Sequence, residues 1–252
     1  MPELPSSLDI LGIPLTAFDD VQHAVECIGQ RVERNEKSFV IAINPEKVLL
    51  GNENQDLRQC MDRANLFICD GIGAAVAAKL LHGRRVSRVT GVSLFFQLLE
   101  QADKQQWEVF LLGAKEETNR VACEQLTAKH PGLKIVGRQS GYFDSDEEVI
   151  ESINQSQAKL LFVAMGSPRQ EIWVHKHFEQ LNPSLLMGVG GSFDVASGHV
   201  KRAPMLAQKT GTEFLYRLIA QPSRWRRQVF RLPRFAYLVF KTRLGFGTSC
   251  DE

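Results

Sequence analysis

Six short apolar runs, separated by helix-length segments, constrain the fold more than any other feature of this sequence. Each run is bounded by Gly, Asp or Asn, and most are rich in Val, Ile, Leu and Phe, a pattern typical of strands buried on both faces. Strands that alternate with helices form a mostly parallel sheet covered by helices on both faces. The sequence therefore predicts an α/β fold with strands at 38–44, 66–70, 107–113, 133–137, 159–166 and 184–191.

Length and composition fit one such domain with a short appendage. The 252 residues are 44% hydrophobic and 23% charged, which are ordinary globular proportions and exclude a disordered chain. Five scattered cysteines without a C-x-x-C pair are typical of reduced cytoplasmic thiols. No signal peptide is recognisable, and no apolar run reaches the roughly 20 residues that span a bilayer. We therefore expect a chain that is soluble or attached to a membrane surface.

Charge is segregated along the chain. Between Lys201 and Arg243 there are eleven basic residues and one acidic residue, so this segment carries a net charge of +10 and the rest carries −9. Such segregation indicates a polyanionic partner, such as anionic lipid, pyrophosphate or nucleic acid. The change in composition divides the chain into a core over 1–200 and a basic appendage over 201–252.

Two side-chain stripes run along the appendage at helical spacing. The apolar stripe contains Trp225, Val229, Leu232, Ala236 and Val239, and the basic stripe contains Arg224, Arg227, Arg231 and Arg234. One interpretation is an amphipathic helix that lies on a membrane and binds its anionic groups. The other is a helix packed on the core with a solvated basic face. Pro233 is expected to kink or divide any helix here.

Candidate ligand-binding residues follow four of the predicted strands, where ligands bind in open parallel sheets. They are Asn44, Asp70, the loop 166–171 (GSPRQE) and the loop 188–194 (GVGGSFD). Asp70 is placed to accept a proton from a substrate hydroxyl, although its spacing alone favours a helix N-cap. The loop 166–171 predicts a helix start, which is either a phosphate site or ordinary helix initiation. The glycines at 188–191 would let a ligand approach the backbone, but they lack the spacing of a dinucleotide-binding motif.

Metal binding is not predicted. Asp144 and Asp146 form a D-x-D pair, which holds metal in many sugar transferases. Here the acids precede a helical pattern, which favours a role at the helix start. His175 and His177 point in different directions on a predicted helix, so they form a poor metal pair and are expected at the surface.

Eight segments of the chain, in order over residues 42–228, resemble the WecG/TagA/CpsF family of bacterial glycosyltransferases. They are AINPEK (42–47), CDGIG (69–73), SRVTG (87–91), FLLGAK (110–115), GYFD (141–144), VAMGSPRQE (163–171), GVGGSFDVASGHVKRAP (188–204) and EFLYRLIAQPSRWRRQ (213–228). Within the family, they are most similar to the branch that acts in enterobacterial common antigen synthesis. That branch transfers N-acetyl-D-mannosaminuronic acid from its UDP donor to undecaprenyl-diphosphate-linked GlcNAc.

The resemblance implies an inverting transfer without metal or cofactor, on a Rossmann-like core with a helical, membrane-binding C-terminal appendage. It implies that Asp70 is the general base. The implied donor- and substrate-binding residues are Asn44, Arg88, Gly166, Ser167, Gln170, Gly190, Gly191 and Asp194. The appendage residues implied to close over the site and hold diphosphate are Arg217, Arg224 and Arg227.

The resemblance also implies binding partners, and alternative functions stay open beside the one that it favours. The expected partners are a UDP-sugar, a polyprenyl-diphosphate-linked sugar acceptor and the anionic inner face of the cytoplasmic membrane; a homo-oligomer is left open. Ala42 stands where many relatives have Thr, and we expect this difference to bear on donor choice. One alternative function is transfer of N-acetylmannosamine, as in teichoic acid synthesis, or of a hexose, as in exopolysaccharide synthesis. A more distant one is a non-catalytic nucleotide- or nucleic-acid-binding module, which the lack of a nucleic-acid-binding motif disfavours.

Overall fold

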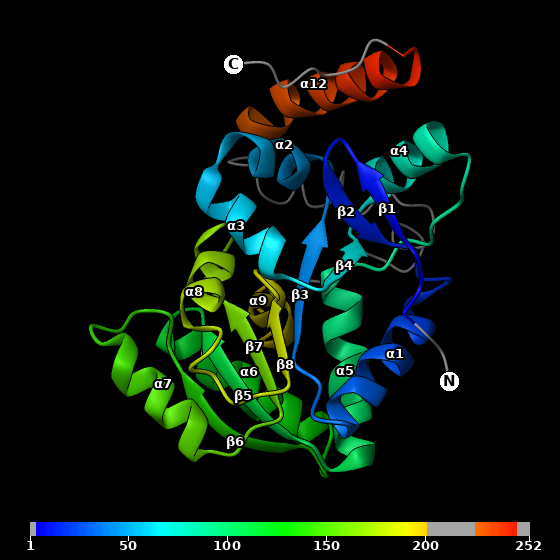
Figure 1. Ribbon diagram of the computed structural model, residues 1–252. Coiled ribbons are helices and arrows are strands. Elements are labelled where there is room, and N and C mark those ends of the chain that lie inside the picture. The colour runs from blue at the N-terminus through cyan, green and yellow to red at the C-terminus, as the bar shows by residue number, and fades with distance from the viewer. Residues whose placement is uncertain (1–3, 201–224, 246–252) are drawn as a thin grey trace.

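A six-stranded, fully parallel sheet forms the centre of the molecule (Figure 1). The computed structural model describes residues 4–200 and 225–245. The strand order is β4-β3-β8-β7-β5-β6. The strands are β3 (Ser38–Ile43), β4 (Leu66–Cys69), β5 (Glu108–Gly113), β6 (Lys134–Gln139), β7 (Leu160–Ala164) and β8 (Leu185–Gly188). All six predicted strands and the α/β class are therefore confirmed.

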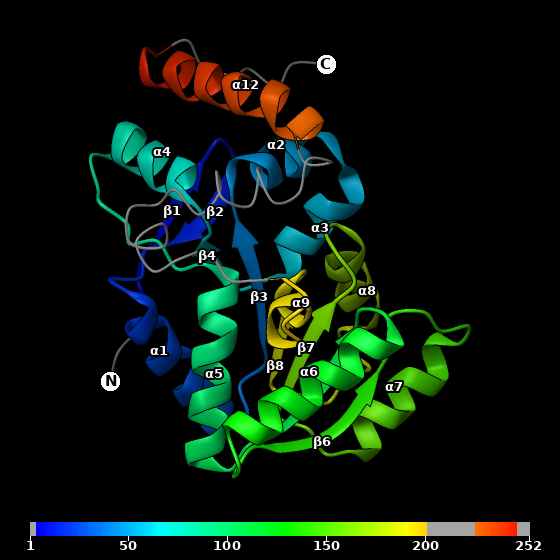
Figure 2. The same cartoon turned by 180° about the vertical axis from the view of Figure 1, so that it is seen from behind.

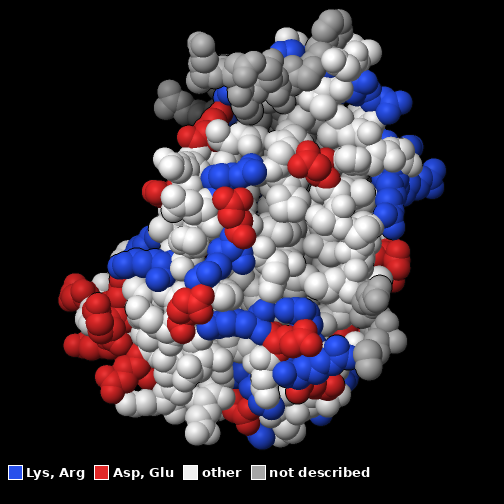
Figure 3. Space-filling view, viewed as in Figure 1, with Lys and Arg blue, Asp and Glu red and all other residues white. Residues whose placement is uncertain are grey.

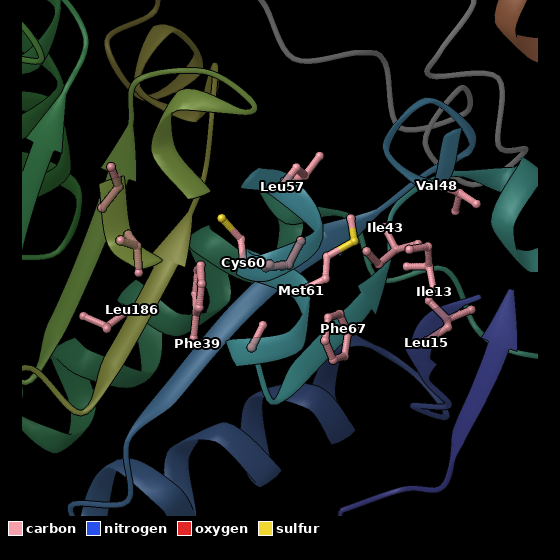
Figure 4. Close-up of a cluster of buried hydrophobic side chains, with 14 of the residues drawn as sticks. Ile13, Leu15, Phe39, Ile43, Val48, Leu57, Cys60, Met61, Phe67 and Leu186 are labelled. Atoms are coloured by element: carbon pink, nitrogen blue, oxygen red, sulfur yellow. The ribbon is translucent and has the colours of Figure 1, made fainter. Parts of the chain in front are cut away.

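Helices cover both faces of this sheet, as the two opposite views in Figures 1 and 2 show. The first face carries α2 (Pro45–Glu53), α3 (Gln55–Arg63), α4 (Ile72–His82), α7 (Asp146–Gln155) and α8 (Arg169–His177). The second carries α1 (Val21–Glu33), α5 (Gly91–Gln105), α6 (Glu116–Lys129) and α9 (Ser192–Ala196). Alternate residues of β3 supply the two cores: Phe39 and Ile43 face the first (Figure 4), and Val40 faces the second.

A small N-terminal hairpin was not predicted. Its strands, β1 (Ser7–Ile10) and β2 (Ile13–Thr16), are antiparallel. The two residues between them, Leu11 and Gly12, have φ of 54° and 82°, as expected for a tight hairpin turn. Ile13 and Leu15 are fully buried in the core of the first face (Figure 4). The hairpin therefore extends this core beyond the edge strand β4.

The helix α12 (Trp225–Arg243) packs across α2 and α4 at the top of the molecule (Figure 1). Phe235 and Val239 are buried against the core, whereas Tyr237 and Phe240 are 65% and 56% exposed. The helix therefore packs one apolar face on the core and leaves a second apolar face exposed. The helix is continuous through Pro233, so the expected division is wrong, whereas the alternative, a kink, stays a prediction. The packing of Phe235 and Val239 offsets the one hydrogen bond that a proline removes.

Among the described residues, no helix has the length and apolar character needed to cross a membrane.

One carboxylate joins α7 to α8. The Oδ1 atom of Asp146 accepts a hydrogen bond from Trp173 Nε1 at 2.7 Å, and Oδ2 lies 2.8 Å from Lys176 Nζ and 3.0 Å from His177 Nε2. Ser145 is the N-cap of α7, which confirms the helix-start interpretation of the D-x-D pair. His177 is only 4% exposed, so its expected surface position is wrong. It is buried because Asp146, on the neighbouring helix, supplies a partner for its ring nitrogen.

We predict that Asp146→Asn lowers the free energy of unfolding by about 2 kcal/mol near neutral pH, the usual value for hydrogen bonds to a charged group. Hydrogen bonds from Lys176 first, then from Trp173 and His177, outweigh partial burial and lower the pKa of Asp146 from 3.8 to about 2. Because its pKa is lower in the folded chain, Asp146 stabilises the fold above pH 3.8, and this stabilisation is lost as the pH falls through about 2.

Urea unfolding of wild type and variant at about pH 6 and about pH 2.5 measures this effect. The stability difference should shrink at the lower pH. Asp144→Asn is the matched control, because Asp144 is exposed two residues away and should change stability by less than about 0.5 kcal/mol. Equal effects of the two variants would contradict the role of Asp146.

Candidate functional site

The chain leaves two adjacent strands toward opposite faces of the sheet, and this divergence opens a cleft at their C-terminal ends. β3 and β8 are neighbours. The helix after β3, α2, packs on the first face through Val48 and Leu49, whereas the helix after β8, α9, packs on the second through Phe193. Such a point in a parallel sheet is where ligands bind.

The cleft has a volume of about 470 Å³. It is lined by Ala42, Asn44, Glu46, Lys47, Leu50, Asp70, Gly91, Val92, Gly166, Ser167, Pro168, Gln170, Gly188, Val189, Gly190, Gly191 and Arg231. It therefore brings together residues from all four predicted strand ends. Two other hollows, one over α7 and one between α6 and β6, are more open to solvent and contain none of the predicted site residues.

Asp70 lies directly after β4 and lines the cleft. Its backbone N–H donates to the carbonyl of Ile43 at 2.8 Å, which fixes it beside the end of β3. The N-cap of α4 is Gly71, with φ of 113°, and no side chain caps that helix. The N-cap interpretation of Asp70 is therefore wrong. The glycine turn directs the chain into α4 and leaves the Asp70 carboxylate at the cleft.

Asn44 lies at the same edge, after β3. Its Oδ1 atom accepts a hydrogen bond from Lys47 N at 2.9 Å, so Asn44 is the N-cap of α2, and Pro45 occupies the first helical position. The cap uses the single oxygen of the amide. The Asn44 side chain still lines the cleft, so this residue both starts the helix and contributes to the site.

The start of α8 faces the cleft through Gly166, Ser167 and Pro168. Its N-cap is Pro168, which has no side-chain cap, and the backbone N–H of Gln170 donates to the carbonyl of Gly166 at 3.0 Å. The amide of Gln170 is held at both ends, because Nε2 donates to Glu171 Oε1 at 2.9 Å and Oε1 accepts from Gly190 N at 3.0 Å. The helix start and the glycine loop after β8 are therefore joined.

Two groups of charged side chains line the cleft or lie beside it. In the first group, Lys47 Nζ lies 2.5 Å from Glu171 Oε1, and both side chains are almost fully buried. At the α12 side, Arg231 lies 3.9 Å from Glu46 and 3.8 Å from Glu53. Arg231 is 27% exposed. An arginine of the C-terminal helix therefore contributes directly to the cleft.

Five predicted residues either do not line the cleft or have side chains outside the described part of the chain. Arg88 is next to Val89, whose N–H donates to the carbonyl of Cys69 at 2.9 Å. Burial raises the pKa of the Cys69 thiol to about 12, with Asp70 adding to the rise and Arg88 opposing it. Arg88 therefore lies near Asp70 without lining the cleft. Asp194 belongs to α9, below the glycine loop. Arg217 and Arg224 lie outside the described residues.

Arg227 belongs to α12, but its side chain lies outside the described part of the structure. Within that part, no three His, Cys, Asp or Glu side chains gather to hold a metal ion; that the reaction needs no metal stays a prediction.

Lys47 and Arg231 were not among the predicted site residues, and Glu171 was included only as the last residue of the candidate loop 166–171. Arg231 was recognised only as a member of the arginine stripe of the appendage. Lys47 and Glu171 follow predicted site residues in AINPEK and GSPRQE. The signal available in the sequence was therefore a charged residue in the first turn of each of the two predicted helices, on a helix whose inner face packs toward the sheet.

We predict that Gly188→Ala lowers the free energy of unfolding by about 1–3 kcal/mol, as overpacking does. A Cβ atom at Gly188 would lie 2.4 Å from Nε2 of Gln170, an amide already fixed by two hydrogen bonds. Gly91→Ala is the control within the same cleft, since its Cβ would make an ordinary contact at 3.8 Å with Ala42. Chemical denaturation of the two variants measures the difference. Equal stability of both would contradict the tight packing of Gln170 on β8.

Comparisons with known proteins identify the family of this chain. The model of the "Glycosyl transferase WecG/TagA/CpsF family" matches residues 8–248. A curated relative from Bacillus spizizenii is 34% identical over 236 residues, which are 94% of this chain and 90% of the relative. Its name is N-acetylglucosaminyldiphosphoundecaprenol N-acetyl-beta-D-mannosaminyltransferase. A glycosyltransferase needs a cleft with room for a sugar donor and an acceptor, and the strand ends form a cleft of about 470 Å³ here. This chain belongs to the WecG/TagA/CpsF family of glycosyltransferases.

Proposed function

We propose that this glycosyltransferase transfers an N-acetylmannosamine-type sugar, in its uronic acid form, from a UDP donor to GlcNAc linked to undecaprenyl diphosphate. The observation that carries this proposal is the cleft itself, because it places the Asp70 carboxylate and the uncapped start of α8 in one cavity. These two groups fit the two ends of a transfer between a hydroxyl acceptor and a diphosphate leaving group. The relative's name supports the class of sugar and the acceptor.

In the proposed reaction, the acceptor hydroxyl oxygen attacks C1 of the donor sugar from the face opposite UDP. The bond between C1 and the diphosphate oxygen breaks, and UDP leaves with the bonding electron pair. Asp70 takes the proton of the attacking hydroxyl, which keeps the oxygen nucleophilic as the new bond forms. Attack opposite the leaving group inverts the configuration at C1. Protonated Asp70 then releases its proton to solvent.

The leaving diphosphate gains negative charge during this step and needs cationic or hydrogen-bonding groups. Helix N-termini offer both free amides and a favourable dipole to phosphate, and the start of α8 borders the cleft. Arg231 reaches the same cleft from α12, and a guanidinium can bind two phosphate oxygens at once. We propose that Arg231 acts with Arg217, Arg224 and Arg227, the appendage arginines expected to hold diphosphate.

We further propose that the α12 end of the molecule faces the inner surface of the cytoplasmic membrane. Tyr237 and Phe240 on α12, and Leu244 directly after it, are exposed, and the appendage has eleven basic residues against one acidic residue. Figure 3 shows acidic side chains gathered at the lower left, where Figure 1 places α7, at the opposite end of the molecule from α12. This separation of charge would orient the cleft toward an anionic surface that carries the lipid-linked acceptor.

The donor is the point on which a second candidate function competes. The Bacillus relative's name favours plain N-acetylmannosamine, whereas the sequence motifs around Asn44 and Gln170 favour the uronic acid. Incubation with lipid-linked GlcNAc and each UDP-sugar in turn tests the choice. A disaccharide lipid from UDP-N-acetylmannosaminuronic acid supports the proposal. Product from UDP-N-acetylmannosamine alone supports the second candidate, and product from neither contradicts both.

We predict that Asp70→Asn lowers kcat by about 10²–10⁴-fold, the usual contribution of a general base, while UDP binding and thermal stability stay close to wild type. The variant keeps the size of the side chain and removes its ability to take a proton. Steady-state kinetics and UDP titration calorimetry provide the two measurements. Turnover near the wild-type value would contradict the role of Asp70 as base.

We predict that Arg231→Gln lowers kcat/KM for the UDP donor by about tenfold or more, as expected for loss of a charge-assisted hydrogen bond. Arg234→Gln is the matched control, since Arg234 lies on the same helix and also pairs with Glu53 but does not line the cleft. Its kcat/KM should stay within about threefold of wild type. Equal losses in both variants would indicate that α12 docking, and not a contact from Arg231, is what matters.

A further inference from the structure

A single buried carboxylate connects the C-terminal ends of three adjacent strands at the cleft. Glu171 is 1% exposed, and its Oε1 atom lies 2.5 Å from Lys47 Nζ and 2.9 Å from Gln170 Nε2. Lys47 follows β3, Glu171 and Gln170 follow β7, and Gly190, which bonds to Gln170, follows β8. Because β3, β8 and β7 are neighbours in the sheet, one oxygen atom joins the loops that form the cleft.

The orientation of the Gln170 amide depends on this oxygen. With Nε2 donating to Glu171, Oε1 is turned toward Gly190 and accepts its N–H at 3.0 Å. The amide also packs directly on Gly188, where a side chain would clash with it. Without the acceptor at Glu171, the Nε2 end would lose its partner in a nearly dry environment, since Gln170 is only 3% exposed. Glu171 therefore fixes the glycine loop through Gln170.

Lys47 extends the same network to the other side of the cleft. Its side chain is 8% exposed and contacts Glu171, while its backbone N–H donates to Asn44 Oδ1 at 2.9 Å. The first turn of α2, which carries Asn44 into the cleft, is thus linked to the first turn of α8. Glu171 acts on Asn44 through Lys47, as it acts on Gly190 through Gln170.

Stability alone does not explain a buried ion pair at this place. Removing two charges from water costs more free energy than most such pairs return, and apolar side chains of similar volume often hold a core equally well. Burial acts to raise the pKa of Glu171, but the Lys47 ammonium and the hydrogen bonds from Lys47 and Gln170 outweigh it, so the pKa lies below its ordinary value. Glu171 is therefore an anionic acceptor at neutral pH, which suits a group that must hold two donors in place.

We propose that Glu171 is a positioning residue: its buried carboxylate holds Gln170 and Lys47, and through them Gly190 and Asn44, in the geometry that binds the donor. The effect on turnover rests on the proposed function. The effect on the Gly190 loop follows from the hydrogen bonds alone and is testable without any substrate.

Two double variants with the same charge and similar side-chain volume test this inference. Lys47→Met with Glu171→Gln removes both charges and keeps an acceptor for Gln170, whereas Lys47→Met with Glu171→Met removes the acceptor as well. Neither variant leaves an unpaired buried charge, so both should fold; the Met variant should melt at a lower temperature than the Gln variant, because it leaves Gln170 Nε2 without an acceptor. The hydrogen-exchange rate of the Gly190 amide, measured by NMR, and kcat/KM for the UDP donor are the two readouts.

We expect the Gln variant to protect the Gly190 amide at least tenfold better than the Met variant and to have at least tenfold higher kcat/KM, because small displacements of a binding group have effects of about this size or larger. Glu179→Gln is the control, since Glu179 pairs with Arg63 at the surface, outside the cleft. It should change neither readout.

Three outcomes would overturn the inference: equal protection of Gly190 in the two double variants, equal kcat/KM, or failure of the Met variant to fold. Absence of turnover by wild type with any UDP-sugar would count against the proposed function instead. The exchange rate of Gly190 would then decide the positioning role by itself.

Discussion

The site depends on one constraint of chain direction. Adjacent strands β3 and β8 send their following helices to opposite faces of the sheet, which opens a cleft above their C-terminal ends between the described elements. A residue placed just after either strand necessarily faces that space. Asn44 and the Gly188–Gly191 loop reach the cleft for this reason, and the neighbouring strands β4 and β7 add Asp70 and the start of α8. The sheet thereby sets the positions of the polar groups before any of them interacts with a ligand.

The C-terminal helix completes the cleft from outside the sheet. α12 is anchored by Phe235 and Val239, which are buried on α2 and α4, and this packing brings Arg231 to the cleft. The two interpretations of the appendage, a helix that lies on a membrane and a helix that packs on the core, are therefore compatible. One face of the helix packs on the core, and the opposite face, with Tyr237 and Phe240, stays exposed. We propose that the same helix contacts the membrane and the donor, which would couple location to activity.

Much of the fold and part of the site were predictable from sequence, for physical reasons. Strands buried on both faces require continuous apolar runs, which explains why β3, β4, β5, β7 and β8 were found; the edge strand β6 has no buried residue and was found from its short apolar run alone. The β1–β2 hairpin was missed because two four-residue strands bury too few side chains to form a recognisable pattern. For Asp70, spacing favoured an N-cap, and only the backbone conformation at Gly71 excludes it.

The sequence contains no local indication of which distant residues pair with each other. Lys47 and Glu171 are 124 positions apart, and their pairing exists only because β3 and β7 end at the same edge of the sheet. The burial of His177 depends likewise on Asp146 from another helix.

The central claim is that the strand-end cleft is where the nucleotide donor binds. Hydrogen exchange of the full chain, with and without saturating UDP, tests it most directly. The account predicts that UDP slows exchange in the segments 44–50, 166–171 and 188–192, which border the cleft, with little change over α7 or along β6. Protection confined to the hollow over α7 or the one between α6 and β6, with none in the three strand-end segments, would contradict it.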